Sequence, residues 1–212
     1  QLRSQIDPHF LFNTLNVILQ TAGQEKAYRT QALITALSHL LRYSLMSNDE
    51  QVPLSREVRI VDEYYSIYHV RFGDRVRMQW KISDSLELTE TMVPSFILQP
   101  IVENAVRHAM RDEGPLHIDI RADVDEGDVL IAVADDGLGM DEQTVAMLRD
   151  GIEGNRGSGC SSDEKGTGIA LRNVAERLER FYGFGSGIDI MSKPGEGTCV
   201  TLRLAHTATH NE

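Results

Sequence analysis

The 212-residue sequence is poor in cysteine and tryptophan, and it contains no long apolar run. Its two cysteines, Cys160 and Cys199, lie in unlike contexts, which argues against a disulfide framework or a zinc site and fits a reduced, intracellular setting. No apolar run approaches the ~18 residues of a membrane span, and no signal peptide is evident. Because the chain begins abruptly in helix-like sequence, we expect a fragment of a longer protein.

Basic residues are also few: 21 Lys and Arg stand against 32 Asp and Glu, for a net charge of -11. The first 50 residues hold four basic and four acidic residues, so the remainder carries the whole negative charge. This balance argues against direct binding of nucleic acid, which needs a basic surface. An anionic ligand must therefore be held by backbone N–H groups, a metal ion and a few cationic side chains.

Two amphipathic helices are predicted in the first 50 residues, at residues 10–22 and 26–46, with a break at Gly23. Each carries an apolar stripe that two helices joined by a tight turn cannot bury alone. Pairing with a second copy would bury these stripes in a four-helix bundle. Packing against the chain's own second domain is the alternative. The polar residues 47–51 mark the boundary, which divides the chain into residues 1–50 and residues 51–212.

The second domain alternates between helical and strand patterns. Residues 151–168 are rich in glycine and charge and predict a mobile loop. The continuous apolar run 129–134 predicts a central strand covered on both faces. Most strands connect through hairpins, which favours an α+β sandwich with a mixed sheet over a doubly wound fold. Helices are predicted at 53–72, 94–110 (kinked at Pro100), 141–149 and 171–182, and strands at 76–82, 116–122, 129–134, 187–192 and 199–204.

One histidine stands at the start of the first helix, where residues 5–13 read QIDPHFLFN. Asp7 and Pro8 are typical of a helix start, because Asp accepts from the first free N–H groups and Pro loses no bond there. His9 then lies in the first turn, partly exposed. A neutral imidazole at such a position is a competent nucleophile toward a phosphoryl group, although a lone histidine is more often a plain surface or core residue.

Three further clusters have residue types suited to ATP. Asn104, Arg107 and His108 share one helical face, and they suit Mg²⁺ and phosphate oxygens. The run DDGLGM at 135–140 ends the most apolar strand, where Asp135 could accept from the adenine amine. The run Gly166-Thr167-Gly168-Ile169 opens a helix, whose free N–H groups suit phosphate. Each cluster alone is equally typical of a polar surface, an acidic turn or a glycine-rich loop.

The order and spacing of these motifs resemble those of LytS-like sensor histidine kinases, over nearly the whole chain. Residues 5–13 resemble the phosphoacceptor box of that class, and LQPIVENA at 98–105 its N box. Residues 135–139, 166–171 and 195–198 resemble its three glycine boxes. The ATP-binding domain of that class has the Bergerat fold of the gyrase, chaperone, histidine kinase and MutL superfamily (GHKL).

The resemblance implies an ATP-dependent protein-histidine kinase that is phosphorylated on His9. It implies that Asn104 holds Mg²⁺, that Asp135 recognises adenine with Thr198 near its edge, and that residues 141–165 form an ATP lid. It further implies a homodimer, a response-regulator partner (often with a LytTR DNA-binding domain), and a cytoplasmic fragment of a membrane-anchored protein. The pocket glycines would be Gly137, Gly139, Gly166 and Gly168, and the additional cations Arg107, His108, Arg156 and Lys165.

The general base is left open by the sequence. Many histidine kinases of other classes have an acidic residue directly after the histidine, and here that residue is Phe10. The candidates are Asp7, which is equally suited to a helix cap, and Glu103, which could instead pair with a nearby arginine. Asn13 could orient a water for dephosphorylation. Hydrolytic superfamily members place a glutamate where this chain has Pro100, so feeble ATP hydrolysis is expected. A superfamily ATPase, a nucleotide-responsive scaffold and a Ser/Thr kinase are the competing interpretations.

Overall fold

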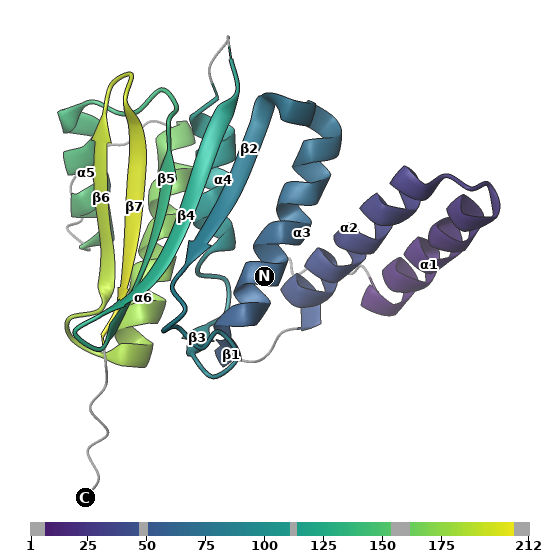
Figure 1. Cartoon of the computed structure of the whole chain (residues 1–212), viewed down its shortest axis with the longest axis horizontal. Coiled ribbons are helices and arrows are strands. Elements are labelled where there is room, and N and C mark those ends of the chain that lie inside the picture. The colour runs from purple at the N-terminus through teal and green to yellow at the C-terminus, as the bar shows by residue number, and fades with distance from the viewer. Residues whose placement is uncertain (1–6, 47–50, 111–113, 154–161, 206–212) are drawn as a thin grey trace, which may run out of the picture.

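A five-stranded sheet forms one layer of the molecule, and helices cover one of its faces (Figure 1). The computed structural model describes residues 7–46, 51–110, 114–153 and 162–205, without the side chains of residues 46 and 162–167. The strand order is β2-β4-β5-β7-β6, with β2 and β4 parallel and the other neighbours antiparallel. The mixed sheet and its hairpin connections are therefore as predicted. The strands are β2 (Val76–Ile82), β4 (Leu116–Asp125), β5 (Asp128–Asp135), β6 (Gly187–Lys193) and β7 (Gly197–Leu204).

The outer face of the sheet is more open than the sequence predicted. In β5 only Ile131 and Val133 are fully buried, and Ala132 and Ala134 on the opposite face are half-buried. The prediction of a central strand covered on both faces is therefore wrong, although β5 is the central strand. The outward residues have polar partners, since Ala132 pairs with Arg121 and Ala134 with Asp119. An apolar run of small side chains can thus lie on a partly solvated face.

Period-2 alternation also decides where Asp135 points. It ends β5 on the same face as Ile131 and Val133, so it faces the helices. The turn between β4 and β5 has two residues with positive φ, Glu126 at 51° and Gly127 at 93°. Two such residues in a tight connection are the signature of a type I′ hairpin, which fits the twist of the strands. The predicted hairpin is confirmed.

The helices of this domain are α3 (Leu54–Phe72), α4 (Gln99–His108), α5 (Glu142–Ile152) and α6 (Ser162–Tyr182), with a short 3₁₀ turn, η1 (Gly73–Arg75), after α3. The predicted helix at 94–110 is wrong in its first part. Residues Met92–Pro94 form strand β3, which pairs with a second unpredicted strand, β1 (Gln51–Pro53). Pro100 lies in the first turn of α4. It therefore begins the helix and does not kink it, because no intrahelical N–H is required there.

A helical hairpin precedes this domain and consists of α1 (Pro8–Gln24) and α2 (Tyr28–Met46). Asp7 caps α1 by accepting from the His9 N–H at 2.9 Å, and Pro8 occupies the first turn, as predicted. The turn comes slightly later than expected, where Lys26 has a φ of 56°. α2 packs on α3, so the hairpin does contact the chain's own second domain. Figure 1 shows α2 and α3 between α1 and the sheet.

Candidate nucleotide-binding site

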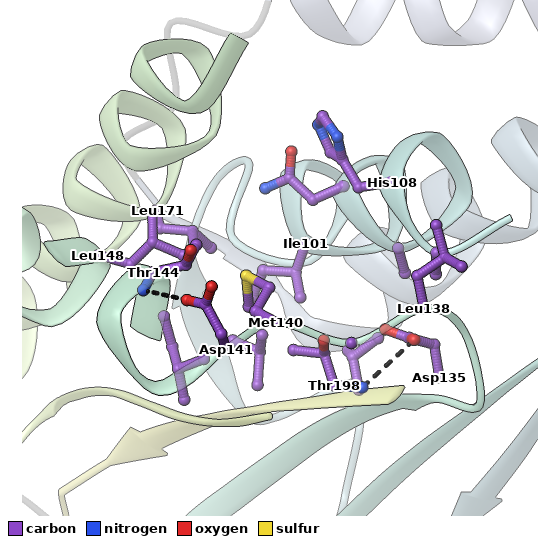
Figure 2. Close-up of a pocket in the computed structure, with 17 residues that line it drawn as sticks. Ile101, His108, Asp135, Leu138, Met140, Asp141, Thr144, Leu148, Leu171 and Thr198 are labelled. Carbon is purple, nitrogen blue, oxygen red and sulfur yellow. Dashed lines mark hydrogen bonds between the residues drawn. The ribbon is translucent and has the colours of Figure 1, made fainter. Parts of the chain in front are cut away.

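A cavity of about 400 Å³ lies between α4, α5 and the ends of β5 and β7 (Figure 2). Its walls are mostly apolar, with a few polar groups that converge on the cavity, which is the usual character of a small-molecule site. It combines the N-box helix, the first glycine loop and the third glycine turn. The lining residues are Ile101, Asn104, Ala105, His108, Ala109, Val133, Asp135, Leu138, Gly139, Met140, Asp141, Thr144, Leu148, Leu171, Ile190, Thr198 and Val200.

α4 brings two of its three predicted polar residues to the cavity. Asn104 and His108 line it, one turn apart. The Nδ2 atom of Asn104 is buried without a hydrogen-bond partner among the described residues. Arg107 does not line the cavity, and its guanidinium instead donates to the Glu103 carboxylate. In the structure, Glu103 is therefore the ion-pair partner of Arg107.

The orphaned amide of Asn104 is the observation that bears on a metal ion. No group of three or more His, Cys, Asp or Glu side chains within the described ranges could hold a metal by itself. Mg²⁺ does not need one, because it commonly takes one or two protein oxygens and completes its shell with phosphate oxygens and water. Which amide atom of Asn104 points into the cavity is a matter of assignment. The Asn104 amide oxygen is the atom that could ligate such an ion jointly with a nucleotide.

Asp135 is fixed at the floor of the cavity by backbone donors. Its Oδ1 accepts from the Gly137 N–H at 2.9 Å and from the Thr198 N–H at 3.3 Å. Figure 2 shows the second of these bonds, across the end of the β5–β7 pair. Its neighbour Asp136 turns away and binds the His117 ring, with Oδ2 and Nδ1 2.8 Å apart. Of the two consecutive carboxylates, only Asp135 lines the cavity.

The first glycine loop is packed against α4 and against the β6–β7 turn. A Cβ added at Gly137 would lie 2.3 Å from the backbone oxygen of Ala109, and one at Gly139 would lie 2.0 Å from that of Lys193. Gly139 also has a φ of 65°. Glycine is therefore required by close backbone approach at both positions. The Gly195 N–H donates to the Leu138 oxygen at 2.7 Å, which ties the loop to the turn.

Ser192 organises the other side of this contact, and the sequence motifs did not identify it. Its Oγ accepts from the Met140 N–H and donates to the Gly197 oxygen at 2.9 Å. Thr198 Oγ1 lies 2.8 Å from the same atom. With the Ser192 proton used by Gly197, Thr198 must donate its own to Ser192, so the lone pairs of Thr198 remain as acceptors. The β6–β7 register, which pairs Ser192 with Thr198, places it there.

α5 forms the wall opposite α4. Asp141 caps it by accepting from the Thr144 N–H at 2.7 Å, and this bond holds the pKa of the carboxyl below its usual value. Val145 and Leu148 of α5 are buried, so residues 142–152 of the predicted lid are a packed helix. The apolar wall residues Met140, Leu148, Leu171, Ile190 and Val200 were also not predicted.

The second glycine box differs from the prediction. α6 begins at Ser162, so Gly166 and Gly168 lie inside a helix and not at its start. The acidic residues at 163 and 164 favour a helix beginning there, because negative charge stabilises the first turn. Gly168 approaches α5, where an added Cβ would lie 3.6 Å from Leu148 Cδ2, and Ile169 is exposed. Arg156 and the side chains of Lys165 and Thr167 lie outside the described residues.

His9 does not line the cavity and is exposed at the start of α1, which α2 and α3 separate from the sheet (Figure 1). Its ring is close to Asn13, whose Nδ2 lies 3.2 Å from Nδ1 and 3.3 Å from Nε2. Asp7 is the nearest carboxylate in the sequence, and it acts as the helix cap. The structure thus brings together His9, Asn13 and Asp7 in one place, and Asn104, His108, Asp135, Gly139 and Thr198 in another.

Comparison with known proteins agrees with this geometry. The family model of histidine kinase-, DNA gyrase B- and HSP90-like ATPases matches residues 93–208, and the histidine kinase model matches residues 1–76. A solved histidine kinase domain from the Erythrobacter litoralis EL346 blue-light activated histidine kinase has the same fold. It superposes with a TM-score of 0.51 at 17% identity, over 94% of this chain and 86% of that one. The chain therefore belongs to the family of histidine kinase-, DNA gyrase B- and HSP90-like ATPases.

Among curated proteins it is similar to sensor proteins. It is 36% identical to the sensor protein LytS of Bacillus anthracis over 205 residues, which is 95% of this chain and 33% of LytS. It is 30% identical to the sensor protein kinase HptS of Staphylococcus aureus over 206 residues, or 96% and 37% of the two chains. The chain thus spans about a third of the length of these relatives. Within the described ranges, no helix has the length and apolar character of a membrane span.

Proposed function

We propose that this chain is the kinase core of a two-component sensor histidine kinase, which transfers the γ-phosphoryl group of ATP to His9 and then to an aspartate of a response regulator. The observation that carries the proposal is the cavity itself, in which Asn104, Asp135 and Thr198 converge in a chain that also has His9 at a capped helix start. The similarity to sensor proteins over both parts supports it.

Recognition of the base follows from the floor of the cavity. Asp135 is held by two backbone N–H groups, so its carboxylate has one orientation and can accept from the exocyclic amine of adenine. Thr198 adds an acceptor beside it. The apolar walls, including Ile101, Met140 and Leu171, exclude water from the ring. The phosphates then extend toward Asn104 and His108 on α4.

Charge neutralisation is the main task in phosphoryl transfer. Asn104 would hold Mg²⁺, which when bound neutralises the phosphate oxygens, and His108 would contribute a hydrogen bond or a positive charge. Arg107 forms an ion pair with Glu103 and does not line the pocket. On the hairpin, Asn13 orients the His9 imidazole, and one ring nitrogen attacks the γ-phosphorus while ADP leaves. We also propose that the triphosphate is surrounded by residues of the second glycine box, namely Lys165, Gly166, Thr167, Gly168 and Ile169.

The hairpin carries apolar side chains that are exposed in the described part of the chain, and we propose that a second copy covers them. On α1, Phe10 is 68% exposed and Val17 63% exposed, and they lie two turns apart on one face. On α2, Leu37 and Leu45 are also exposed, eight residues or about two turns apart. Two hairpins would bury these faces as a four-helix bundle. The full-length protein is proposed to be membrane-anchored, with a response regulator that carries a LytTR domain.

The test is to incubate the purified chain with γ-labelled ATP and Mg²⁺ and to locate the label. A phosphohistidine is labile to acid and stable to base, so label on His9 should be lost in acid. Label that survives acid would instead indicate a Ser/Thr kinase. Steady phosphate release without labelled protein would indicate an ATPase. Tight ATP binding with neither product would indicate a nucleotide-responsive scaffold.

A further inference from the structure

Glu57, on α3, is the only charged side chain fully buried in the described part of the chain, and it does not line the cavity. A carboxylate is tolerated away from water only where donors surround it. Glu57 has four donors, which come from two different parts of the molecule. A residue buried at such cost suggests a specific role in the arrangement of the helices.

Three of these donors are consecutive backbone N–H groups immediately before α4. Phe96 donates to Oε1, and Ile97 and Leu98 donate to Oε2, each at 2.9 Å. α4 begins at the next residue, so the carboxylate occupies the place of an anion at a helix N-terminus, where the dipole and free N–H groups favour it. Phe96 has a φ of 61°, a left-handed conformation that is uncommon without glycine. The carboxylate therefore holds a strained turn at the start of the N-box helix.

The fourth donor is the hydroxyl of Tyr43, which belongs to α2 of the hairpin. Tyr43 is only 2% exposed, and its ring centroid lies 4.3 Å from that of Phe96. Burial, with the Glu57 charge as a second cause, raises the pKa of this hydroxyl far above its usual value, so it remains a protonated donor. The hairpin is thus attached to the carboxylate that caps α4.

A contact from α6 completes this junction. Arg177 donates from Nη1 to the Ser95 oxygen at 2.8 Å, and its guanidinium lies 5.9 Å from the Phe96 ring centroid. The same helix supplies Leu171 to the cavity wall. Residues 95–98 are therefore the place where α2, α3, α4 and α6 meet.

We propose that Glu57 is a positioning residue for the nucleotide site, and that Tyr43 couples the helical hairpin to that site through it. The reasoning is mechanical: α4 carries Asn104 and His108 into the cavity, so displacement of its first turn moves both. The inference rests on the proposed function. Coupling between two sites is reciprocal, so nucleotide bound at α4 must also change the stability of the attached part of α2.

The first test measures the affinity of the full chain for ADP by calorimetry. Glu57→Gln replaces an acceptor oxygen with a donor that faces backbone N–H groups, so we expect ADP to bind about tenfold more weakly, within the usual range for coupled sites. Glu63→Gln is the matched control, because Glu63 lies on the same helix and binds His39 and Arg59 but not the turn before α4. It should bind ADP as the wild type does. Equal affinity in Glu57→Gln and the wild type overturns the positioning role.

The second test does not depend on Glu57→Gln remaining folded. Hydrogen exchange of the wild type, with and without ADP, should show slower exchange in the last turns of α2 when ADP is bound. Tyr43→Phe keeps the ring on Phe96 and removes only the donor, so it should still bind ADP but lose this protection of α2. Protection that persists in Tyr43→Phe, or that is absent from a wild type that binds ADP, overturns the coupling. A wild type that binds no ADP at all contradicts the proposed function instead.

Discussion

The helical hairpin and the sheet domain differ in how much of their apolar surface the chain buries by itself. The hairpin has a small core of its own, Leu15, Ala22 and Ile34, and leaves Phe10 and Val17 exposed. The sheet domain has one large core that extends from β2 to β7 and also takes in Tyr43 from α2. The sheet domain thus buries its apolar residues around one core, whereas the hairpin packs on α3 and leaves part of its apolar surface exposed.

This difference has a chemical counterpart. The cavity holds its polar groups rigidly, with Asp135 and Ser192 fixed by backbone bonds at 2.8–3.3 Å. His9 is exposed at a helix start and has only Asn13 and the Asp7 cap near it. A rigid site suits recognition of one nucleotide. An exposed imidazole suits a group that must meet first ATP and later a second protein.

The largest effect is expected from the hairpin. His9→Gln should abolish acid-labile labelling by γ-labelled ATP, because the amide has no nucleophilic ring nitrogen, while ADP binding to the remote cavity stays unchanged. His39→Gln is the control, since His39 lies on the same hairpin but binds Glu63. Acid-labile label that persists in His9→Gln would show that His9 is not the phosphorylated residue. It would also contradict the assignment of phosphorylation to the hairpin and nucleotide binding to the sheet domain.

The next effect concerns the rigidity of the cavity. Gly197 has a φ of 93°, and an added Cβ would lie 1.9 Å from the Asp135 oxygen, whereas Gly195, at 77°, has open space. Gly195→Ala should cost roughly 1–2 kcal/mol, the penalty of a left-handed residue with a Cβ. Gly197→Ala should cost clearly more, because the strand ends must also separate. Urea unfolding measures both, and equal losses would show that the backbone approach at Gly197 is unimportant.

A smaller effect tests recognition of the base. Asp135→Asn should weaken ADP binding by roughly 1–3 kcal/mol, the usual loss for a charged hydrogen bond out of water. Asp136→Asn provides the control, because that neighbouring carboxylate binds His117 outside the cavity. Calorimetry of the two variants compares them directly. If the two lose the same affinity, Asp135 has no special role.

The smallest effect is expected at the exposed face of the hairpin. Val17→Glu places a charge where a second copy is proposed to pack, and it should weaken self-association by at least about tenfold, or ~1.4 kcal/mol. Gln20→Glu adds the same charge at an exposed polar position of α1. Sedimentation at several concentrations gives the association constant. Unchanged association in Val17→Glu would show that this face is not the dimer surface, while the sheet domain should be unaffected in both variants.

Local patterns were reliable wherever one residue's chemistry decides the outcome. The Asp7 cap, the end of α3 at Gly73 and the hairpin turn at residues 125–128 follow from backbone preferences, and each is where it was predicted. The patterns failed where distant segments meet. β1 and β3 are too short to show periodicity and exist only because they pair with each other. Pro100 is a local signal for the start of α4, but the Glu57 carboxylate that accepts from Leu98 in the preceding turn lies 41 positions earlier, where no local pattern could place it.

The sequence by itself determined the alternation that turns Asp135 inward and the helical spacing of Asn104 and His108. These are properties of short segments and of the intrinsic geometry of strands and helices. Only the tertiary structure decided that Ser192 joins the two glycine turns and that Glu57 unites Tyr43 with α4. Each of those depends on which donors meet which acceptors after the chain has folded.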